Sequence, residues 1–391
     1  MRELSAHIAS VLLVLSGSAT VGLPQTWLPL LEPPEPGPDS SPGTITAEFP
    51  DGPRAALARD RPASDPVGGT IVITNLFDNR ITWDPDDGVI SVYEARIYAR
   101  NDTGPNVLYF HPSFGRVVIK YESFTLPSPE DTFVGRDLVR APGGTWNDAG
   151  TVSGVFLDGV LTVTGQDARI HHCYAGFDWD KTTPLSNVFW PSISVQGNHC
   201  RVYDNRFCAD PDDGDGGVLS VGGEDNWAYG NVIGLENDLL TPHAMPPRVG
   251  LIVSGRRNRI GDRADAANHI LASETCIEIS GRGHRVRSNA IGRNTGGKTC
   301  RYGVELKPST EVPTRENYIG GPSGQPGLSH NIITNFTEAG VYFGEGCHYN
   351  AMGGNLIGLK PNGTLAFPRG KTGVIIGANT VGNEVGGSSS N

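Results

Sequence analysis

The sequence contains few charged residues, and basic residues are the scarcer kind. Of its 391 residues only 19% are charged and 8% are aromatic, and the 42 acidic residues outnumber the 31 basic ones, which gives a formal net charge of −11. A negative chain repels nucleic acid, so we expect no nucleic-acid partner bound through a basic surface. The low charge content also argues against intrinsic disorder, which is typical of highly charged chains.

Several motifs that mark common function classes are absent as well. The six cysteines form no CxxC pair, which makes a zinc site improbable. We find no nucleophile elbow, no P-loop and no dinucleotide-binding fingerprint, and no window keeps a helical i, i+3, i+4 apolar stripe for long. The apolar run near the N-terminus, residues 8–15, is well short of the about 20 residues that span a bilayer, so we expect no transmembrane span in the mature chain.

Glycine, in contrast, is abundant, and much of it belongs to a repeated phrase. The 52 glycines are nearly twice the usual share of about 7%. Between Ser192 and Gly386 the phrase apolar-x-apolar, usually followed by glycine, returns in seven copies, at residues 193–197, 219–222, 251–255, 277–281, 304–307, 341–344 and 374–377. A second phrase, Asn-x-apolar, follows at Asn231, Asn258, Asn289, Asn317, Asn355 and Asn383.

These two phrases predict an all-β solenoid. Self-similarity with a period of 20 to 50 residues is the signature of a repeat protein, and alternation over three residues is strand periodicity. We therefore expect each coil to supply several short strands, with Gly and Asn at corners that need positive φ. The predicted fold is a parallel β-helix.

The repeat resembles that of secreted pectate-lyase-like proteins. The resemblance is closest where Asn355-Leu356-Ile357-Gly358 is followed by Asn-Gly-Thr at 362–364 and by Gly373-Val374-Ile375-Ile376. Residues 70–78 and 91–95 are similar to the opening of a bacterial extracellular class of this fold, in which this segment forms the first strand and a short capping helix. The resemblance implies a right-handed parallel β-helix over residues 151–391, preceded by an N-terminal cap and first coils over residues 69–150.

The first 68 residues lie outside this repeat pattern. Residues 1–21 hold an apolar run followed by small residues, which reads as a secretory signal peptide or, alternatively, an N-terminal arm. Residues 22–68 are rich in proline and read as an extended linker. We therefore expect a secreted or cell-surface protein.

The most promising candidate site is a pair of carboxylates. Glu278 and Glu305 hold the middle, outward position of two consecutive copies, so their side chains should lie one rung, about 4.8 Å, apart on one face. Like charges that close disfavour joint ionisation, so one pKa should rise unless a cation intervenes. Lys307 should lie on the same face, and we expect Arg285 and Arg287, which follow the Glu278 strand, to lie on that face as well. Such a carboxylate pair suits a glycosidase or a cation-assisted lyase, but it also fits a solvated Glu-Glu-Lys ladder.

The resemblance implies roles for these residues. In pectate-lyase-like enzymes acidic residues bind Ca²⁺ or substrate, and an Arg or Lys abstracts the proton α to the uronate carboxylate. By this analogy the candidate catalytic residues are Glu278, Glu305, Lys307 and Arg285, and Arg287 is a candidate for substrate binding. Tyr342, in the outward position of the coil after Glu305, would supply a face on which a sugar stacks.

Two loops contain further candidates. Asp210, Asp212, Asp213 and Asp215 lie within six residues on a glycine-rich turn and could bind Ca²⁺, although a solvated insertion loop is the alternative. Residues 171–181 are polar and aromatic, and among them Trp179 is a candidate for carbohydrate binding, together with Phe189 and Trp190. The alternative is that this loop packs on the solenoid. Cysteines 173 and 200, and 276 and 300, are separated by about one coil, so they fit disulfides or buried ladder residues equally well.

Two functions remain open from the sequence. The first is a secreted enzyme, a lyase or hydrolase, that acts on an acidic polysaccharide. The second is a non-catalytic surface or virion-associated β-helix that binds a cell-surface glycan or has a structural or adhesive role. Fold alone does not separate them, because function depends on the site that the fold carries.

Overall fold

The computed structural model describes the repeat region and parts of the segment before it. The described residues are 70–73, 107–110, 117–118, 132–141, 144–146, 150–178, 180–185, 192–208, 217–244, 246–263, 266–321, 330–359 and 372–386. They contain 29 β-strands and no helix, and accordingly no described helix has the length and apolarity needed to cross a bilayer. The predicted signal peptide and linker, and residues 74–106 of the predicted cap, lie outside these ranges.

Each coil contributes up to three short strands, and equivalent strands of successive coils pair in parallel. The first strands form a nine-stranded sheet, made of β5 (Gly144–Trp146), β7 (Val160–Val163), β10 (Ser192–Val195), β13 (Gly217–Val221), β16 (Val249–Val253), β19 (Thr275–Ile279), β22 (Cys300–Leu306), β25 (Phe336–Phe343) and β28 (Thr372–Ile376). The seven apolar-x-apolar phrases fall in β10 to β28, so the predicted parallel β-helix is confirmed.

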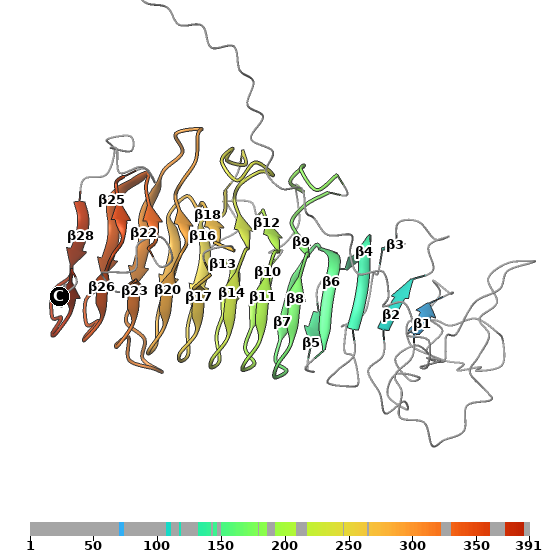
Figure 1. Ribbon diagram of the computed structural model, residues 1–391, viewed down its shortest axis with the longest axis horizontal. Coiled ribbons are helices and arrows are strands. Elements are labelled where there is room, and N and C mark those ends of the chain that lie inside the picture. Colours follow the sequence, from blue (N-terminus) through green and yellow to red (C-terminus); the bar gives the residue numbers. More distant parts are fainter. Residues whose placement is uncertain are drawn as a thin grey trace, which may run out of the picture. The chain divides into compact units, whose positions relative to one another are not determined.

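The second and third strands of the coils belong to a twenty-stranded sheet. The second strands are β8 (Arg169–His171), β11 (Arg201–Tyr203), β14 (Trp227–Tyr229), β17 (Arg259–Gly261), β20 (Arg285–Arg287), β23 (Tyr318–Gly320), β26 (Ala351–Gly353) and β29 (Glu384–Val385). The third strands are β9 (Tyr174–Ala175), β12 (Arg206–Phe207), β15 (Val232–Ile233), β18 (His269–Ile270), β21 (Ala290–Ile291), β24 (Ile332–Ile333) and β27 (Leu356–Ile357). Figure 1 shows the second strands from β8 to β26 side by side in chain order.

The earlier strands continue the same pairing. They are β1 (Thr70–Ile73), β2 (Val107–Phe110), β3 (Val117–Val118), β4 (Thr132–Ala141) and β6 (Thr151–Leu157). β1 pairs with β2, β2 and β3 pair with β4, and β4 pairs with β6, all in parallel. The first coils therefore begin before residue 151.

The core lies between the strands because alternate side chains point inward. In β19 the flanking Ile277 and Ile279 are fully buried, while Glu278 between them is partly exposed. Val202, Ile260 and Val286, at the middle of the second strands, are likewise fully buried. Each coil thus adds a layer of apolar side chains that contacts only its neighbours, as in other solenoids.

Asparagine side chains connect the coils at two corners. The first asparagine ladder lies directly before the second strands and contains Cys200, Asn226, Asn258, His284, Asn317, Asn350 and Asn383. The second asparagine ladder lies directly before the third strands and contains Cys173, Asn205, Asn231, Asn268, Asn289, Asn331 and Asn355. In a typical step the Oδ1 atom of Asn231 accepts the backbone N–H of Asn205 at 3.1 Å, and its Nδ2 donates to the carbonyl of Val202 at 2.9 Å.

The backbone at these corners differs in part from the prediction. The predicted positive φ is confirmed for glycines such as Gly234 and Gly292. It is wrong for the asparagines of the two ladders, because the left-handed residue is usually the one before each ladder residue. Examples are Asp204 (φ 55°), Ser288 (φ 55°) and Glu316 (φ 59°). The physical reason is that the asparagine side chain must point inward to form hydrogen bonds with two coils. The change of chain direction therefore falls on the residue before it.

Histidine replaces asparagine once in the first ladder. His284 is fully buried, and its Nδ1 accepts the backbone N–H of Asn258 at 3.1 Å. Its Nε2 lies 2.9 Å from the carbonyl oxygen of Ser280 and therefore carries the proton. Burial lowers the pKa of His284 to about 4, against a smaller opposite effect of the Ser280 carbonyl. The ring is thus neutral near pH 7 and acts as an acceptor in the position of an amide oxygen.

The cysteines are buried thiols, which confirms the ladder or core alternative over disulfides. All six are free and buried. Cys173 and Cys200 begin the two ladders, and the Sγ of Cys200 lies 3.2 Å from the carbonyl oxygen of Gly165. Cys276 and Cys300 are hydrogen-bonded to each other, which together with burial raises the pKa of Cys300.

Candidate functional site

The structure brings together part of the predicted site on the nine-stranded sheet. Glu278 of β19 and Glu305 of β22 are direct register partners, and Tyr342 of β25 is the next residue in the same row. The Nζ of Lys307 lies 2.6 Å from Glu278 and 3.8 Å from Glu305. We call Glu278, Glu305 and Lys307 the Glu–Lys cluster. The predicted one-rung spacing and common face of the two carboxylates are confirmed.

The electrostatics of the Glu–Lys cluster follow from burial and ion pairing. Burial raises the pKa of Glu305, and the charge of Glu278 adds a smaller upward effect. Two groups partly offset this rise: the hydroxyl of Thr275, which donates a hydrogen bond to Glu305 at 2.9 Å, and the charge of Lys307. Burial alone would lower the pKa of Lys307, but the hydrogen bond and charge of Glu278 and the charge of Glu305 outweigh it, and the pKa is raised. Lys307 is therefore an ammonium ion at neutral pH, which cannot abstract a proton.

Aromatic rings adjoin this cluster. Tyr342 stacks on Tyr302, with ring centroids 5.1 Å apart and planes at 21°. Tyr302 is buried, and its hydroxyl donates to Glu338 at 2.9 Å. Arg301 lies over the Tyr302 ring at 4.9 Å and pairs with Glu338 at 3.1 Å. The partly exposed Tyr342 is thus the ring of this pair on which a sugar could stack.

The predicted arginines do not belong to this cluster. Arg285 and Arg287 lie on β20, which is a strand of the twenty-stranded sheet, whereas Glu278 lies on β19 of the nine-stranded sheet. The expectation that they share the face of the carboxylate pair is wrong. The cause is the corner at residues 280–284, which turns the chain from one sheet to the other between the two strands.

Arg285 and Arg287 instead line a polar groove of about 660 Å³ along the second strands. We call it the arginine groove. Its lining comprises Asp225, Arg256, Arg257, Arg259, Arg282, Gly283, His284, Arg285, Arg287, Glu316 and Tyr318. Six arginines thus face two carboxylates, in a protein whose formal net charge is −11.

The corner before the second strands explains why the arginine groove is open. Arg256, Arg282 and Arg315 are bridge partners in successive coils, so the next residues, Arg257, Gly283 and Glu316, occupy equivalent positions. Arg257, Gly283 and Glu316 all have positive φ. Only the glycine lacks a side chain there, so the middle of these three coils is left open.

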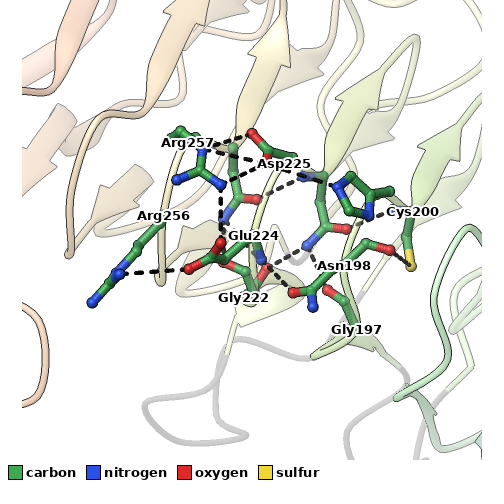
Figure 2. Close-up of polar contacts among 12 residues, drawn as sticks. Gly197, Asn198, Cys200, Gly222, Glu224, Asp225, Arg256 and Arg257 are labelled. Carbon is green, nitrogen blue, oxygen red and sulfur yellow. Dashed lines mark hydrogen bonds and ion pairs between the residues drawn. The ribbon is translucent and has the colours of Figure 1, made fainter.

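Carboxylates neutralise some of the groove's arginines at one end. Figure 2 shows the side chain of Arg257 between Glu224 and Asp225, with which it pairs at 2.9 and 2.7 Å, and Arg256 pointing to Glu224 at 3.7 Å. Arg282 pairs with Glu316 at 2.7 Å. Such exposed pairs contribute little stability because solvent screens them. They leave these guanidinium groups able to exchange partners.

Arg259 and Arg285 remain without such partners. They are exposed and register directly with each other on β17 and β20, and their guanidinium groups make no hydrogen bond or ion pair with another described residue. Arg287 is partly satisfied: it lies over the ring of Tyr318 at 5.2 Å and 3.7 Å from Asp262, while its buried Nε has no hydrogen-bond partner in the described part of the chain. The groove therefore offers cationic donors that no acceptor of the described chain uses.

The remaining candidates cannot be placed. Trp179, Phe189, Trp190 and the aspartates 210, 212, 213 and 215 lie outside the described residues, so calcium binding by the acidic loop stays a prediction. Within the described ranges, no three His, Cys, Asp or Glu residues group in a way that could hold a metal ion.

The sequence contains a signal that points to the groove. Each second strand begins directly after a ladder residue, so aligning the chain on Asn258, His284 and Asn317 puts Arg259, Arg285 and Tyr318 in one outward row. As a turn signal alone, the Asn-x-apolar phrase does not reveal this row.

Comparisons with known proteins identify no family for this chain. No family model matches the chain, and no curated protein matches it. Among solved structures, the chain is similar to that described as "Crystal structure of Dettilon tailspike protein (gp208)", with 14% sequence identity and a TM-score of 0.42, over 81% of this chain and 61% of that chain. This chain therefore spans less than two thirds of that protein. The assignment as a parallel β-helix rests on the strand register of the chain itself.

Proposed function

We propose that this β-helix binds an acidic glycan and that the arginine groove is the binding site. The observation that carries the proposal is the density of cationic donors, six arginines in one groove of an acidic protein, two of them unpaired. A guanidinium group binds carboxylate or sulfate through two parallel hydrogen bonds. Tyr318 in the lining adds a ring on which a sugar face can stack.

The Glu–Lys cluster favours a protein that binds the glycan without cleaving it by β-elimination. A lyase needs a base that is neutral before it takes the proton, and a raised pKa keeps Lys307 protonated. The arginine that the resemblance would offer instead, Arg285, lies on another sheet. The protein thus fits a non-catalytic glycan-binding role at a surface outside the cell.

Hydrolysis at the Glu–Lys cluster is a second candidate, favoured by one observation. The raised pKa of Glu305, whose carboxyl lies beside the ion-paired Glu278, favours Glu305 as a proton donor, as a general acid requires. Their one-rung spacing of about 4.8 Å is close to the about 5 Å of retaining glycosidases. Glu305→Gln would abolish any such activity, whereas Arg285→Ala would leave the chemical step unchanged.

The proposed binding is tested with a panel of pectate, alginate, chondroitin sulfate, hyaluronan and neutral dextran. We expect the wild type to bind at least one acidic glycan and not dextran, and Arg259→Ala/Arg285→Ala to bind at least tenfold more weakly, since two charge-assisted contacts are lost. Arg301→Ala, which removes an exposed arginine from the nine-stranded sheet, is the matched control and should bind normally. Equal binding by the double variant would refute the proposal.

The same samples test the catalytic alternatives and the predicted calcium site. Ultraviolet absorbance of an unsaturated product reports a lyase, and a reducing-end assay reports a hydrolase; we expect both to stay flat. Calorimetric titration with Ca²⁺ of the wild type and of Asp213→Asn/Asp215→Asn tests the acidic loop, for which we propose a weak site that the variant loses.

A further inference from the structure

The outward row that contains Arg259 and Arg285 continues beyond the groove. We infer that the glycan lies parallel to the stack of coils, on a track formed by the first residues of six consecutive second strands: Arg169, Arg201, Trp227, Arg259, Arg285 and Tyr318. We call this set the arginine track. The inference rests on the proposed function, because the groove forms one half of the track and supplies its anion-binding chemistry.

Backbone register places the six side chains in line. Each is the direct partner of the next in parallel pairing, and each is followed by a buried residue, so all six point away from the core. Five steps of about 4.8 Å give the track a length of about 24 Å. Figure 1 shows the strands that carry them, β8, β11, β14, β17, β20 and β23, side by side.

The track contains two pairs of directly opposed arginines. Arg169 opposes Arg201, and Arg259 opposes Arg285. Like charges directly opposite each other in a sheet are destabilising, and none of the four guanidinium groups forms a hydrogen bond or ion pair with another residue that the structure describes. An anionic group placed between the members of a pair would relieve this repulsion. Two such places occur, one inside the arginine groove and one beyond it.

An aromatic side chain follows each arginine pair. Trp227 is half-buried, and its indole N–H donates to the carbonyl of Gly261 at 2.6 Å, which fixes the ring on the sheet. Tyr318 is half-buried in the same way and carries Arg287 over its ring. Along the track, two arginines followed by an aromatic residue thus occur twice. The first set is Arg169, Arg201 and Trp227, and the second is Arg259, Arg285 and Tyr318.

This order fits a linear glycan that carries anionic groups. A pyranose residue in an extended chain advances by about the separation of two neighbouring strands, so successive sugars match successive coils. Carboxylate or sulfate groups would lie between paired arginines, and the apolar faces of other sugars would stack on Trp227 and Tyr318. A single-stranded nucleic acid is less suited, because Trp227 and Tyr318 are three coils, about 14 Å, apart, and a net charge of −11 opposes a polymer charged at every unit.

Ligand length separates the track from the groove. The probes are a chondroitin sulfate tetrasaccharide, which at one sugar per coil covers four of the six positions of the track, a decasaccharide, which covers all six, and single-stranded oligothymidine of comparable length. Affinities are measured by calorimetry for the wild type, Arg285→Ala, Arg201→Ala and the control Arg301→Ala. All three replaced arginines are exposed, so we expect all variants to fold.

We expect the decasaccharide to bind at least fivefold more tightly than the tetrasaccharide. Arg285→Ala should weaken both, whereas Arg201→Ala should weaken the decasaccharide at least fivefold and abolish its advantage. If Arg285→Ala weakens both ligands but Arg201→Ala changes neither, the groove binds glycan and the extended track is refuted. If neither variant matters, the groove and the track are both refuted, and tighter binding of oligothymidine would refute a glycan as the ligand.

Discussion

His284 makes the stability of this fold depend on pH in a way that can be isolated. Its Nδ1 accepts the backbone N–H of Asn258, and a protonated ring would turn that acceptor into a second donor. Burial lowers the pKa of His284 from 6.5 to about 4 in the folded chain. Because the folded value lies below the unfolded one, the contribution of the neutral ring is fully present above pH 6.5 and is lost as the pH falls toward 4.

The size of the effect follows from the two pKa values. A difference of about 2.5 units at about 1.36 kcal/mol per unit gives about 3 kcal/mol in total, of which about 2 kcal/mol is already lost at pH 5. Asparagine at position 284 would keep the acceptor, as in the neighbouring steps of the ladder, and would remove the titration. His171, His243 and His269 also have pKa values lowered to about 4, so only the difference between wild type and variant reports on His284.

The assay is urea unfolding of the wild type and His284→Asn at pH 7.5 and pH 5. We expect the wild type to lose about 2 kcal/mol more free energy of unfolding than the variant between these two values. Hydrogen exchange of the Asn258 amide should accelerate at pH 5, relative to its intrinsic rate, in the wild type alone. The same pH dependence in both proteins would show that His284 is not an uncharged acceptor in the ladder, and the reasoning would be refuted.

Three further predictions concern the ladder, the Glu–Lys cluster and the corners. Asn231→Ala should lower the free energy of unfolding by about 2 to 4 kcal/mol, because buried groups of two coils lose their partners; a loss below 0.5 kcal/mol by urea unfolding would contradict this. Lys307→Met should destabilise by about 1 kcal/mol, and the loss should shrink when Glu278→Gln is added, as a double-mutant cycle would measure. Gly261→Ala should lower Tm far more than Gly297→Ala: both residues have positive φ, but a Cβ at 261 would lie 1.9 Å from a backbone oxygen and one at 297 would contact nothing. Equal changes would refute the clash.

The sequence predicted the first strands well because their alternation is a direct consequence of burial. Ile277 and Ile279 must point into the core, so Glu278 between them must point to the surface. The register of Glu278 with Glu305 then follows from the repeat. The spacing of these carboxylates needed no knowledge of the loops.

The groove could not be predicted in the same way. Whether Arg285 shares a face with Glu278 depends on where the chain turns between them, and the corner at residues 280–284 contains no proline and no apolar alternation that would mark a change of sheet. The pairing of Arg257 with Glu224 and Asp225 joins residues from different coils, so it depends on three-dimensional register. Alignment of the ladder residues places Arg259 and Arg285 in one row, but it does not show which arginines of the groove are paired with carboxylates.

The second asparagine ladder has a consequence for how coils can differ in length. In some coils the second and third strands are separated by two residues, as at Asp204-Asn205, whereas the connection from Gly261 to His269 and that from Gly320 to Ile332 are longer. In each case an asparagine, Asn268 or Asn331, still directly precedes the third strand and bonds the next coil. Inserted residues therefore enter ahead of the asparagine, which restores the register behind them. Homologous chains should accordingly gain or lose residues on the upstream side of these asparagines, and loops of new sequence could be grafted there without displacing the coils that follow.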